Sequence, residues 1–176
     1  MHDYNLGFIS NENIYQHVKK TVEGYRRENG LITINAIMIR DFHKNILHYA
    51  PNGWIIPEKG FDVENQERHI FVEMKDRHIT MNSLSSQYTY IKMQQKLLED
   101  DEAICYLVEY LSTKSRDEIW EFSLDNTLYS HERIRRMSLD RFYTLVFKDN
   151  EAYSKLHNKL PEIISDVIRE ENHVAF

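Results

Sequence analysis

The sequence predicts a single α/β domain over residues 1–176, in which helices flank a mixed β-sheet. Its 176 residues, 41% of them hydrophobic, are enough to build one compact core. The expected order is two helices, three strands, a helix, a strand and then mostly helices, which is typical of a mixed sheet covered by helices. We therefore expect helices over 1–50, the sheet over 51–125 and helices again over 126–176.

Two helices are expected in the first part of the chain. Ser10 has the side chain of a helix N-cap, and apolar residues follow it at helical spacing, which predicts a helix over about 11–28. Gly30 ends this helix. A second helix is expected over 41–49, and the turn chemistry of Pro51-Asn-Gly53 ends it.

Strand signals replace helix signals after this turn. Short strands are expected over 54–56 and 61–63, and a polar turn over 64–67 separates them from a longer strand over 69–75. These three segments therefore predict a hairpin or meander.

The second half of the chain begins with another helix, which Ser85 or Ser86 can cap and which runs to about residue 99. The stretch 103–111 is nearly all apolar, as expected for a strand buried on both faces. One more strand and two more helices are expected over residues 119–122, 138–145 and 151–170.

Composition excludes several classes of protein. No apolar stretch approaches the roughly 20 residues of a membrane span, and the start of the chain lacks the pattern of a secretory signal. One cysteine, Cys105, can form neither an internal disulfide nor a cysteine-based zinc site. We therefore expect a cytoplasmic protein. The net charge of −6 argues against a general nucleic-acid coating protein, but it leaves open a DNA enzyme with local positive patches.

Three ionisable residues in the predicted hairpin form the most informative pattern. In a strand, residues two apart face the same side, so Glu73 and Lys75 lie together at the end of one strand. Asp62 lies on the neighbouring strand and can converge on the same place. Two carboxylates on strands suit Mg²⁺, and a lysine beside the metal can orient or deprotonate an attacking water. The alternative is an ordinary strand with an exposed Glu-Lys pair, which a bare Glu-x-Lys favours.

These three residues resemble the PD-(D/E)xK nuclease motif, with Phe61 at a position that often holds proline. Longer stretches resemble type II restriction endonucleases that cut GGNCC or GGWCC sites. The stretches that carry this resemblance are Asn5–Ser10, Asn52–Trp54, Gly60–Asp62, His69–Lys75, Thr80–Ser83, Thr89–Gln94, Lys96–Asp101 and Tyr129–Arg136. The chain is shorter than members of that family between the first helix and Asn52.

The resemblance implies a restriction-endonuclease-like core and a Mg²⁺-dependent enzyme that cuts both strands of a short palindromic, G/C-rich DNA site. Asp62 and Glu73 would hold the metal, and Lys75 would activate the water. The same resemblance implies a homodimer on double-stranded DNA and a cognate DNA methyltransferase encoded nearby. Two alternatives stay open: a repair or structure-specific nuclease of the same fold, and a shortened DNA-binding remnant with little or no activity.

Two clusters of polar residues are candidate DNA contacts. Amides, hydroxyls and a lysine follow the catalytic strand and can bond phosphates or base edges, and arginines further along can pair with guanine. These candidates are Asn82, Ser83, Ser85, Ser86, Gln87, Lys92, Arg133, Arg135 and Arg136. For any one of them the competing interpretation is a helix cap or a solvated charged face.

Overall fold

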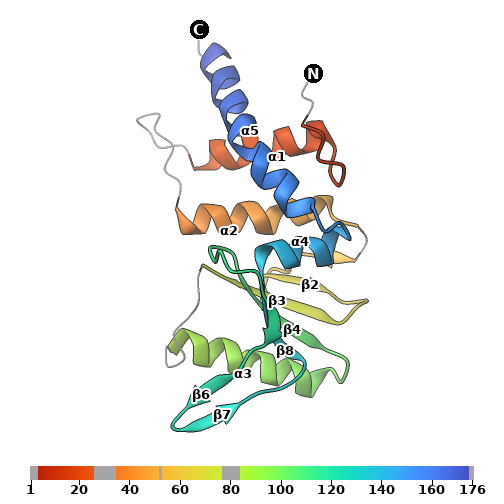
Figure 1. The fold of residues 1–176 in the computed structure, drawn as a ribbon, viewed down its shortest axis with the longest axis vertical. Coiled ribbons are helices and arrows are strands. Elements are labelled where there is room, and N and C mark those ends of the chain that lie inside the picture. Colours follow the sequence, from red (N-terminus) through yellow and green to blue (C-terminus); the bar gives the residue numbers. More distant parts are fainter. Residues whose placement is uncertain (1–3, 26–34, 52, 77–83, 175–176) are drawn as a thin grey trace.

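The structure is a computed structural model that describes residues 4–25, 35–51, 53–76 and 84–174, with 171–174 described by their backbone alone. Two helices come first along these ranges, three strands follow, a third helix separates these from the remaining strands, and two helices end the chain (Figure 1). No helix within the described ranges is both long and apolar enough to cross a membrane.

The first helix, α1, covers Asn11–Gly24 and begins where the sequence predicts. The Ser10 hydroxyl oxygen accepts a hydrogen bond from the backbone N–H of Asn13 at 3.2 Å, which satisfies a donor that the helix itself leaves unpaired. The expected end at about 28 lies outside the described residues.

The second helix, α2, covers Ala36–Asn45 and continues into a 3₁₀ turn, η1, over Ile46–Tyr49. The Asn35 side chain accepts a hydrogen bond from the backbone N–H of Met38 at 2.8 Å and so caps α2. The helix therefore begins at Ala36, before the expected residue 41. The sequence conceals this start because the residues around Asn35 are apolar.

Six strands form one mixed sheet, as predicted. Their order across the sheet is β1-β2-β3-β4-β8-β5. The first three pair antiparallel, β3, β4 and β8 run parallel, and β5 returns antiparallel to β8. Their bounds are Trp54–Ile55 (β1), Val63–Asn65 (β2), Ile70–Lys75 (β3), Ile104–Glu109 (β4), Ile134–Ser138 (β8) and Asp117–Ile119 (β5).

The predicted meander over β1, β2 and β3 is confirmed, but the expected turn over 64–67 is wrong at its start. Glu64 and Asn65 belong to β2, and the turn covers 66–69. Asn65 is buried, and its side-chain oxygen accepts a hydrogen bond from the backbone N–H of Arg68 at 3.2 Å. A polar residue therefore closes the strand here, where the sequence alone suggested a loop.

The expectation of helices throughout 126–176 is also wrong. The strand β8 lies in this part and pairs with β4 in the middle of the sheet. The expected strand over 119–122 is divided, because β5 ends at Ile119 and β6 begins at Phe122. The β6 strand, Phe122–Leu124, forms a separate two-stranded hairpin with β7, Thr127–Tyr129. The arginines in β8 hide its strand character, because charged residues interrupt its apolar pattern.

The other three helices agree with the predictions. They are α3 over Leu84–Glu99, α4 over Leu139–Phe147 and α5 over Ala152–Val174. Ser85 and Ser86 lie inside the first turn of α3, so neither is its N-cap. The last helix continues through Pro161.

The sheet separates two layers (Figure 1). The helices α1, α2, α4 and α5 lie on one side of the sheet, and α3 with the β6–β7 hairpin lies on the other. The alternation in β3 follows this division, because Val72 and Met74 belong to the core under the four helices, whereas Phe71 belongs to the core under α3. Glu73 and Lys75 therefore share the face opposite Val72 and Met74, as predicted, and this face is the one that α3 covers.

Candidate active site

Asp62 lies immediately before β2 and is held by two neighbouring elements. Its Oδ2 accepts a hydrogen bond from the backbone N–H of Met74 in β3 at 2.8 Å. Its Oδ1 lies 3.7 Å from the ammonium of Lys44 at the end of α2. The carboxylate is therefore fixed against β3 and stays partly accessible.

Glu73 lies in β3 and is only 8% exposed. Burial raises the pKa of its carboxyl group, the hydrogen bond and charge of Lys92 oppose this shift, and the negative charge of Asp62 adds to it. Two carboxylates thus interact electrostatically, and one of them is largely removed from water.

Lys92 approaches this pair from α3. Its ammonium forms an ion pair with Glu73 Oε1, donates a hydrogen bond to the backbone carbonyl of Gly60 at 2.6 Å and lies 4.6 Å from the ring centre of Phe61. Lys92 therefore ties the segment before β2 to β3. The sequence placed Lys92 among the DNA contacts and did not reveal its pairing with Glu73.

Lys75 ends β3 and is half-buried. Its backbone carbonyl accepts a hydrogen bond from the backbone N–H of Tyr110 at 2.9 Å, and the positive charge of its ammonium lowers the pKa of Glu73. Of the two lysines beside Glu73, Lys92 is the one whose ammonium is held by Glu73 and by the carbonyl of Gly60.

The donor set fits Mg²⁺. In the described part of the chain no three His, Cys, Asp or Glu side chains cluster as metal ligands. The residues that would hold a metal at this site are Asp62 and Glu73, whose charges interact. The charge of Asp62 raises the pKa of Glu73, and a cation between two such carboxylates relieves this repulsion. Mg²⁺ commonly takes one or two carboxylates and keeps its other positions for water and phosphate.

A second buried carboxylate, Glu109, lies at the end of β4, and its partner in the register of β3 and β4 is Lys75. It is fully buried. Its Oε1 accepts a hydrogen bond from Arg136 Nε at 2.9 Å and lies 3.7 Å from Arg116, while Oε2 has no hydrogen-bond partner in the described part of the chain. Sequence reasoning missed Glu109, although an acid that interrupts the apolar run 103–111 is a signal that could have found it.

The three predicted DNA-contacting arginines lie on or beside β8, each against a protein acceptor. Arg133 donates to the backbone carbonyl of Ala103 at 3.1 Å, Arg135 Nε donates to Asp117 at 3.2 Å, and Arg136 binds Glu109. Their role in DNA binding stays a prediction.

The remaining predicted DNA contacts surround the start of α3. Asn82 and Ser83 lie outside the described residues. Ser85 is exposed, Gln87 is half-buried and Ser86 is buried. Solvent therefore reaches the side chains of Ser85 and Gln87, whereas the side chain of Ser86 is buried.

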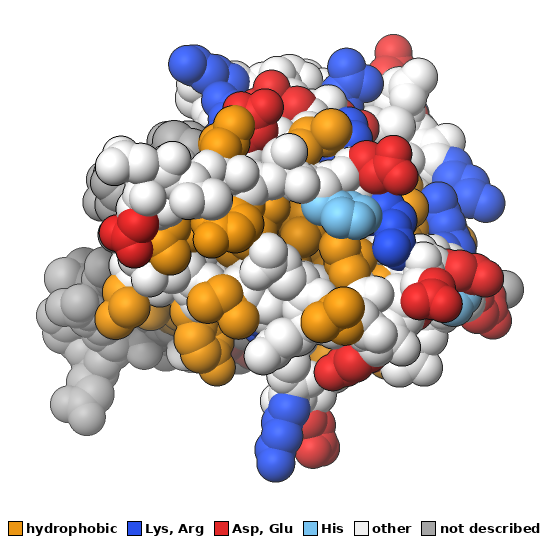
Figure 2. All heavy atoms as spheres, turned by 90° about the horizontal axis from the view of Figure 1, so that it is seen from below, with side chains coloured by type: hydrophobic (Ala, Val, Ile, Leu, Met, Phe, Trp, Pro, Cys, Tyr) orange, Lys and Arg blue, Asp and Glu red, His pale blue; other side chains and the backbone are white. Residues whose placement is uncertain are grey.

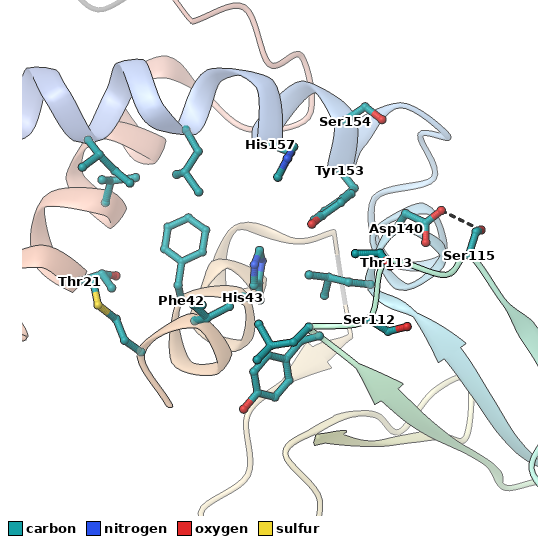
Figure 3. Close-up of a pocket in the computed structure, with 18 of the residues that line it drawn as sticks. Thr21, Phe42, His43, Ser112, Thr113, Ser115, Asp140, Tyr153, Ser154 and His157 are labelled. Atoms are coloured by element: carbon teal, nitrogen blue, oxygen red, sulfur yellow. Dashed lines mark hydrogen bonds between the residues drawn. The ribbon is translucent and has the colours of Figure 1, made fainter. Parts of the chain in front are cut away.

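A cavity of about 690 Å³ lies away from these carboxylates, between α1, α2, α5 and the segment after β4 (Figure 3). His43 points into it and accepts or donates a 2.7 Å hydrogen bond at the Tyr143 hydroxyl, and Ser115 donates to Asp140 at 3.0 Å. Burial lowers the pKa of His43 to about 3. A neutral imidazole among apolar walls offers no pair of carboxylates for a metal, so the candidate site remains at Asp62 and Glu73.

Comparison with known proteins places the chain in a family. Residues 32–169, most of the chain, match the family described as Eco47II restriction endonuclease. The chain is also 32% identical over 116 residues to the type II restriction enzyme Sau96I of Staphylococcus aureus, which covers 61% of this chain and 44% of that protein. The chain thus aligns with less than half the length of this relative. No solved structure shows a significant match. The chain belongs to the Eco47II restriction endonuclease family.

Proposed function

We propose that this chain is a Mg²⁺-dependent type II restriction endonuclease that cuts both strands of a short palindromic, G/C-rich DNA site of the GGNCC type. The convergence of Asp62, Glu73 and Lys75 at one end of the sheet carries the proposal. Membership of the Eco47II family supports it, and the name of the relative, a type II restriction enzyme, gives the reaction class.

Each residue of the site has a distinct task. Asp62 and Glu73 hold the metal, which when bound supplies positive charge to the scissile phosphate and to the leaving 3′ oxygen. Lys75 orients a water molecule and, once its amine has given its own proton to solvent, takes a proton from that water as the water oxygen bonds to phosphorus. The bond from phosphorus to the 3′ oxygen breaks in the same in-line displacement. The 3′ oxygen takes a proton from solvent water, which leaves a 3′ hydroxyl and a 5′ phosphate.

Lys92 acts on this reaction through Glu73. Its ammonium opposes the burial that raises the pKa of Glu73, and so favours the ionised carboxylate that a metal requires. Its bond to the carbonyl of Gly60 also holds the chain just before Asp62. Lys92 is therefore a positioning residue, distinct from the catalytic Lys75.

The remaining parts of the proposal concern the setting of the enzyme. A palindromic site presents the same phosphate twice, and each chain carries one Asp62–Glu73–Lys75 group, so we expect a homodimer on double-stranded DNA. A cytoplasmic location and a cognate methyltransferase encoded nearby complete the restriction system.

Plasmid cleavage in the presence of Mg²⁺ tests this function. Discrete fragments from double-strand cuts at one short sequence are expected, and sequencing of their ends identifies that site. Nicking that depends on DNA structure would favour the repair nuclease, whereas binding without cleavage would favour the shortened remnant.

A further inference from the structure

The outer face of α3 is a poor surface for the phosphates of DNA. Figure 2 views the molecule from the side of α3 and shows hydrophobic side chains across the middle of this face, with lysine and arginine side chains at its margins. The ammonium groups of the two lysines of α3, Lys92 and Lys96, turn to Glu73 and to the ring of Phe71. Since DNA binding depends on positive charge against phosphates, the site needs basic groups from another element.

The helix α2 presents two basic side chains to Asp62. Arg40 and Lys44 are four residues apart, so they lie on one side of this helix. The ammonium of Lys44 lies 3.7 Å from Asp62 Oδ1. Burial lowers the pKa of Arg40, but its hydrogen bond to Asp41 and the charges of Asp41 and Asp62 outweigh burial and raise it. Both side chains therefore feel the carboxylate that is proposed to hold the metal.

Arg40 and Lys44 differ in how firmly they are held. Arg40 donates hydrogen bonds to Asp41 Oδ1 from Nε at 3.2 Å and from Nη2 at 3.1 Å. The 3.7 Å between Lys44 and Asp62 is longer than a hydrogen bond, so charge alone links these two groups. The side chain of Lys44 is also 22% exposed. Lys44 is therefore the one of the two that can exchange its partner for a ligand from solvent.

Lys44 and a metal would share the same carboxylate. Asp62 Oδ2 already accepts a hydrogen bond from the backbone N–H of Met74, and Oδ1 faces Lys44. A divalent cation held by Asp62 adds two positive charges beside an ammonium, and these charges repel each other. A phosphate bound to the same cation offers Lys44 a new anion next to the old one, and lysine is a common ligand of phosphate.

We propose that Lys44 is a phosphate-binding residue, which pairs with Asp62 before Mg²⁺ binds and turns to an oxygen of the DNA phosphate afterwards. This inference rests on the proposed function, since it needs a metal at Asp62 and a phosphodiester beside it. It adds α2 to the elements that contact DNA. The exchange also couples the two ligands, because Lys44 opposes the metal when DNA is absent and attracts the phosphate when both are present.

Lys44→Met tests the effect of Lys44 on the metal. Calorimetric titration of the whole chain with Mg²⁺, without DNA, should show at least about threefold tighter binding, because the substitution removes a competing positive charge. Lys44→Arg keeps the charge and should bind Mg²⁺ like the wild type. Lys159→Met is the matched control, since it removes an ammonium 3.5 Å from Glu162 on α5 and should leave the affinity for Mg²⁺ unchanged. Circular dichroism and thermal melting establish that each variant is folded.

Fluorescence anisotropy with a DNA duplex tests the effect of Lys44 on the phosphate. In Ca²⁺, Lys44→Met should lose about tenfold in affinity at low salt, and the slope of log affinity against log salt should fall by about one, because one phosphate contact is gone. In EDTA the same variant should lose less than about twofold, since Lys44 then pairs with Asp62. Lys44→Arg should retain the wild-type affinity in both conditions. A purely structural ion pair would not weaken DNA binding only when a metal is present.

Three results with a folded Lys44→Met variant would overturn the inference. The first is Mg²⁺ binding no tighter than that of the wild type. The second is DNA binding in Ca²⁺ that matches Lys159→Met, which would leave Lys44 with its ion pair alone. The third is an equal loss of DNA affinity in Ca²⁺ and in EDTA, which would make Lys44 a DNA contact that needs no metal.

Cleavage separates this inference from the proposed function. A wild type that cuts plasmid at one site, while Lys44→Met behaves like its control in both titrations, would uphold the function and overturn the inference. A wild type that cuts no plasmid, while Lys44→Met binds Mg²⁺ more tightly and DNA more weakly in Ca²⁺ alone, would uphold the role of Lys44 and reject the function.

Discussion

Buried ionisable groups have different partners on the two sides of the sheet. Under the four helices, burial lowers the pKa of His17 to about 4 and that of His43 to about 3, so both imidazoles are neutral and serve the packing. On the α3 side, Glu73 and Glu109 are buried as partners of lysine and arginine. The buried carboxylates on the α3 side thus lie beside basic side chains, whereas the two buried histidines hydrogen-bond to neutral groups. This difference teaches that the α3 side is built around ion pairs and the four-helix side around neutral packing.

The largest expected effect is on cleavage. Glu73→Gln, Asp62→Asn and Lys75→Met should each reduce the rate constant of DNA cleavage by more than about 1,000-fold, or ~4 kcal/mol of transition-state stabilisation, because each removes a metal ligand or the group that activates water. Single-turnover cleavage and calorimetric titration with Mg²⁺ measure these losses. Only the two carboxylate changes should weaken metal binding.

Glu67→Gln is the matched control, since Glu67 is exposed in the turn between β2 and β3. It should cut at the wild-type rate. A folded Glu73→Gln variant that cut as fast as this control would show that Glu73 is not part of the active site.

The next effect concerns stability on the same side. Glu109→Gln should lower the free energy of unfolding by about 3 kcal/mol, because it leaves Arg136 and Arg116 beside a neutral group in a buried place. Chemical denaturation measures this change. Glu118→Gln is the control, since Glu118 is near the same two arginines but is 56% exposed, and it should cost less than about 1 kcal/mol. Equal losses in the two variants would contradict the contrast between buried and exposed carboxylates.

The buried histidines under the four helices should make the free energy of unfolding fall in acid. His17 and His43 have lowered pKa values in the folded protein, so their contribution to stability is full above pH 6.5 and is lost as pH falls from there toward about 4 and 3. Each histidine should add up to about 1.4 kcal/mol per pH unit to the slope of unfolding free energy in that window.

Denaturation at a series of pH values measures this slope. His43→Gln should reduce the slope by the contribution of one proton, up to about 1.4 kcal/mol per pH unit. Gln95→Ala, which removes an exposed side chain that does not titrate, should leave the slope unchanged. A slope that His43→Gln did not alter would show that His43 is protonated in the folded protein.

The convergence of Asp62, Glu73 and Lys75 was predictable from sequence because it depends on local rules, and their catalytic role stays a prediction. Strand alternation alone places Glu73 and Lys75 on one face, and one hairpin brings Asp62 to them. The pairing of Glu109 with Arg136 joins residues 27 positions apart, through the register of β4 and β8. No local pattern encodes that register, and the arginines that satisfy Glu109 are the residues that made β8 look like a charged surface segment.

The smallest expected effect on stability is at Arg135, on the rim of the charged side. Arg135 and Asp117 are both partly exposed, so Arg135→Ala should cost less than about 1 kcal/mol of unfolding free energy.

The effect of Arg135→Ala on DNA binding should depend on salt concentration and on DNA sequence in a way that identifies the role of Arg135. If Arg135 binds a phosphate, the variant should lose affinity equally for all duplexes, and the slope of log affinity against log salt should fall by about one. If it reads guanine, the loss should be about 1–3 kcal/mol and confined to the cognate site. Fluorescence anisotropy in Ca²⁺ distinguishes these results, with Lys19→Ala, on α1, as a control for net charge. Binding that matched this control at every salt concentration would assign Arg135 to its ion pair with Asp117 alone.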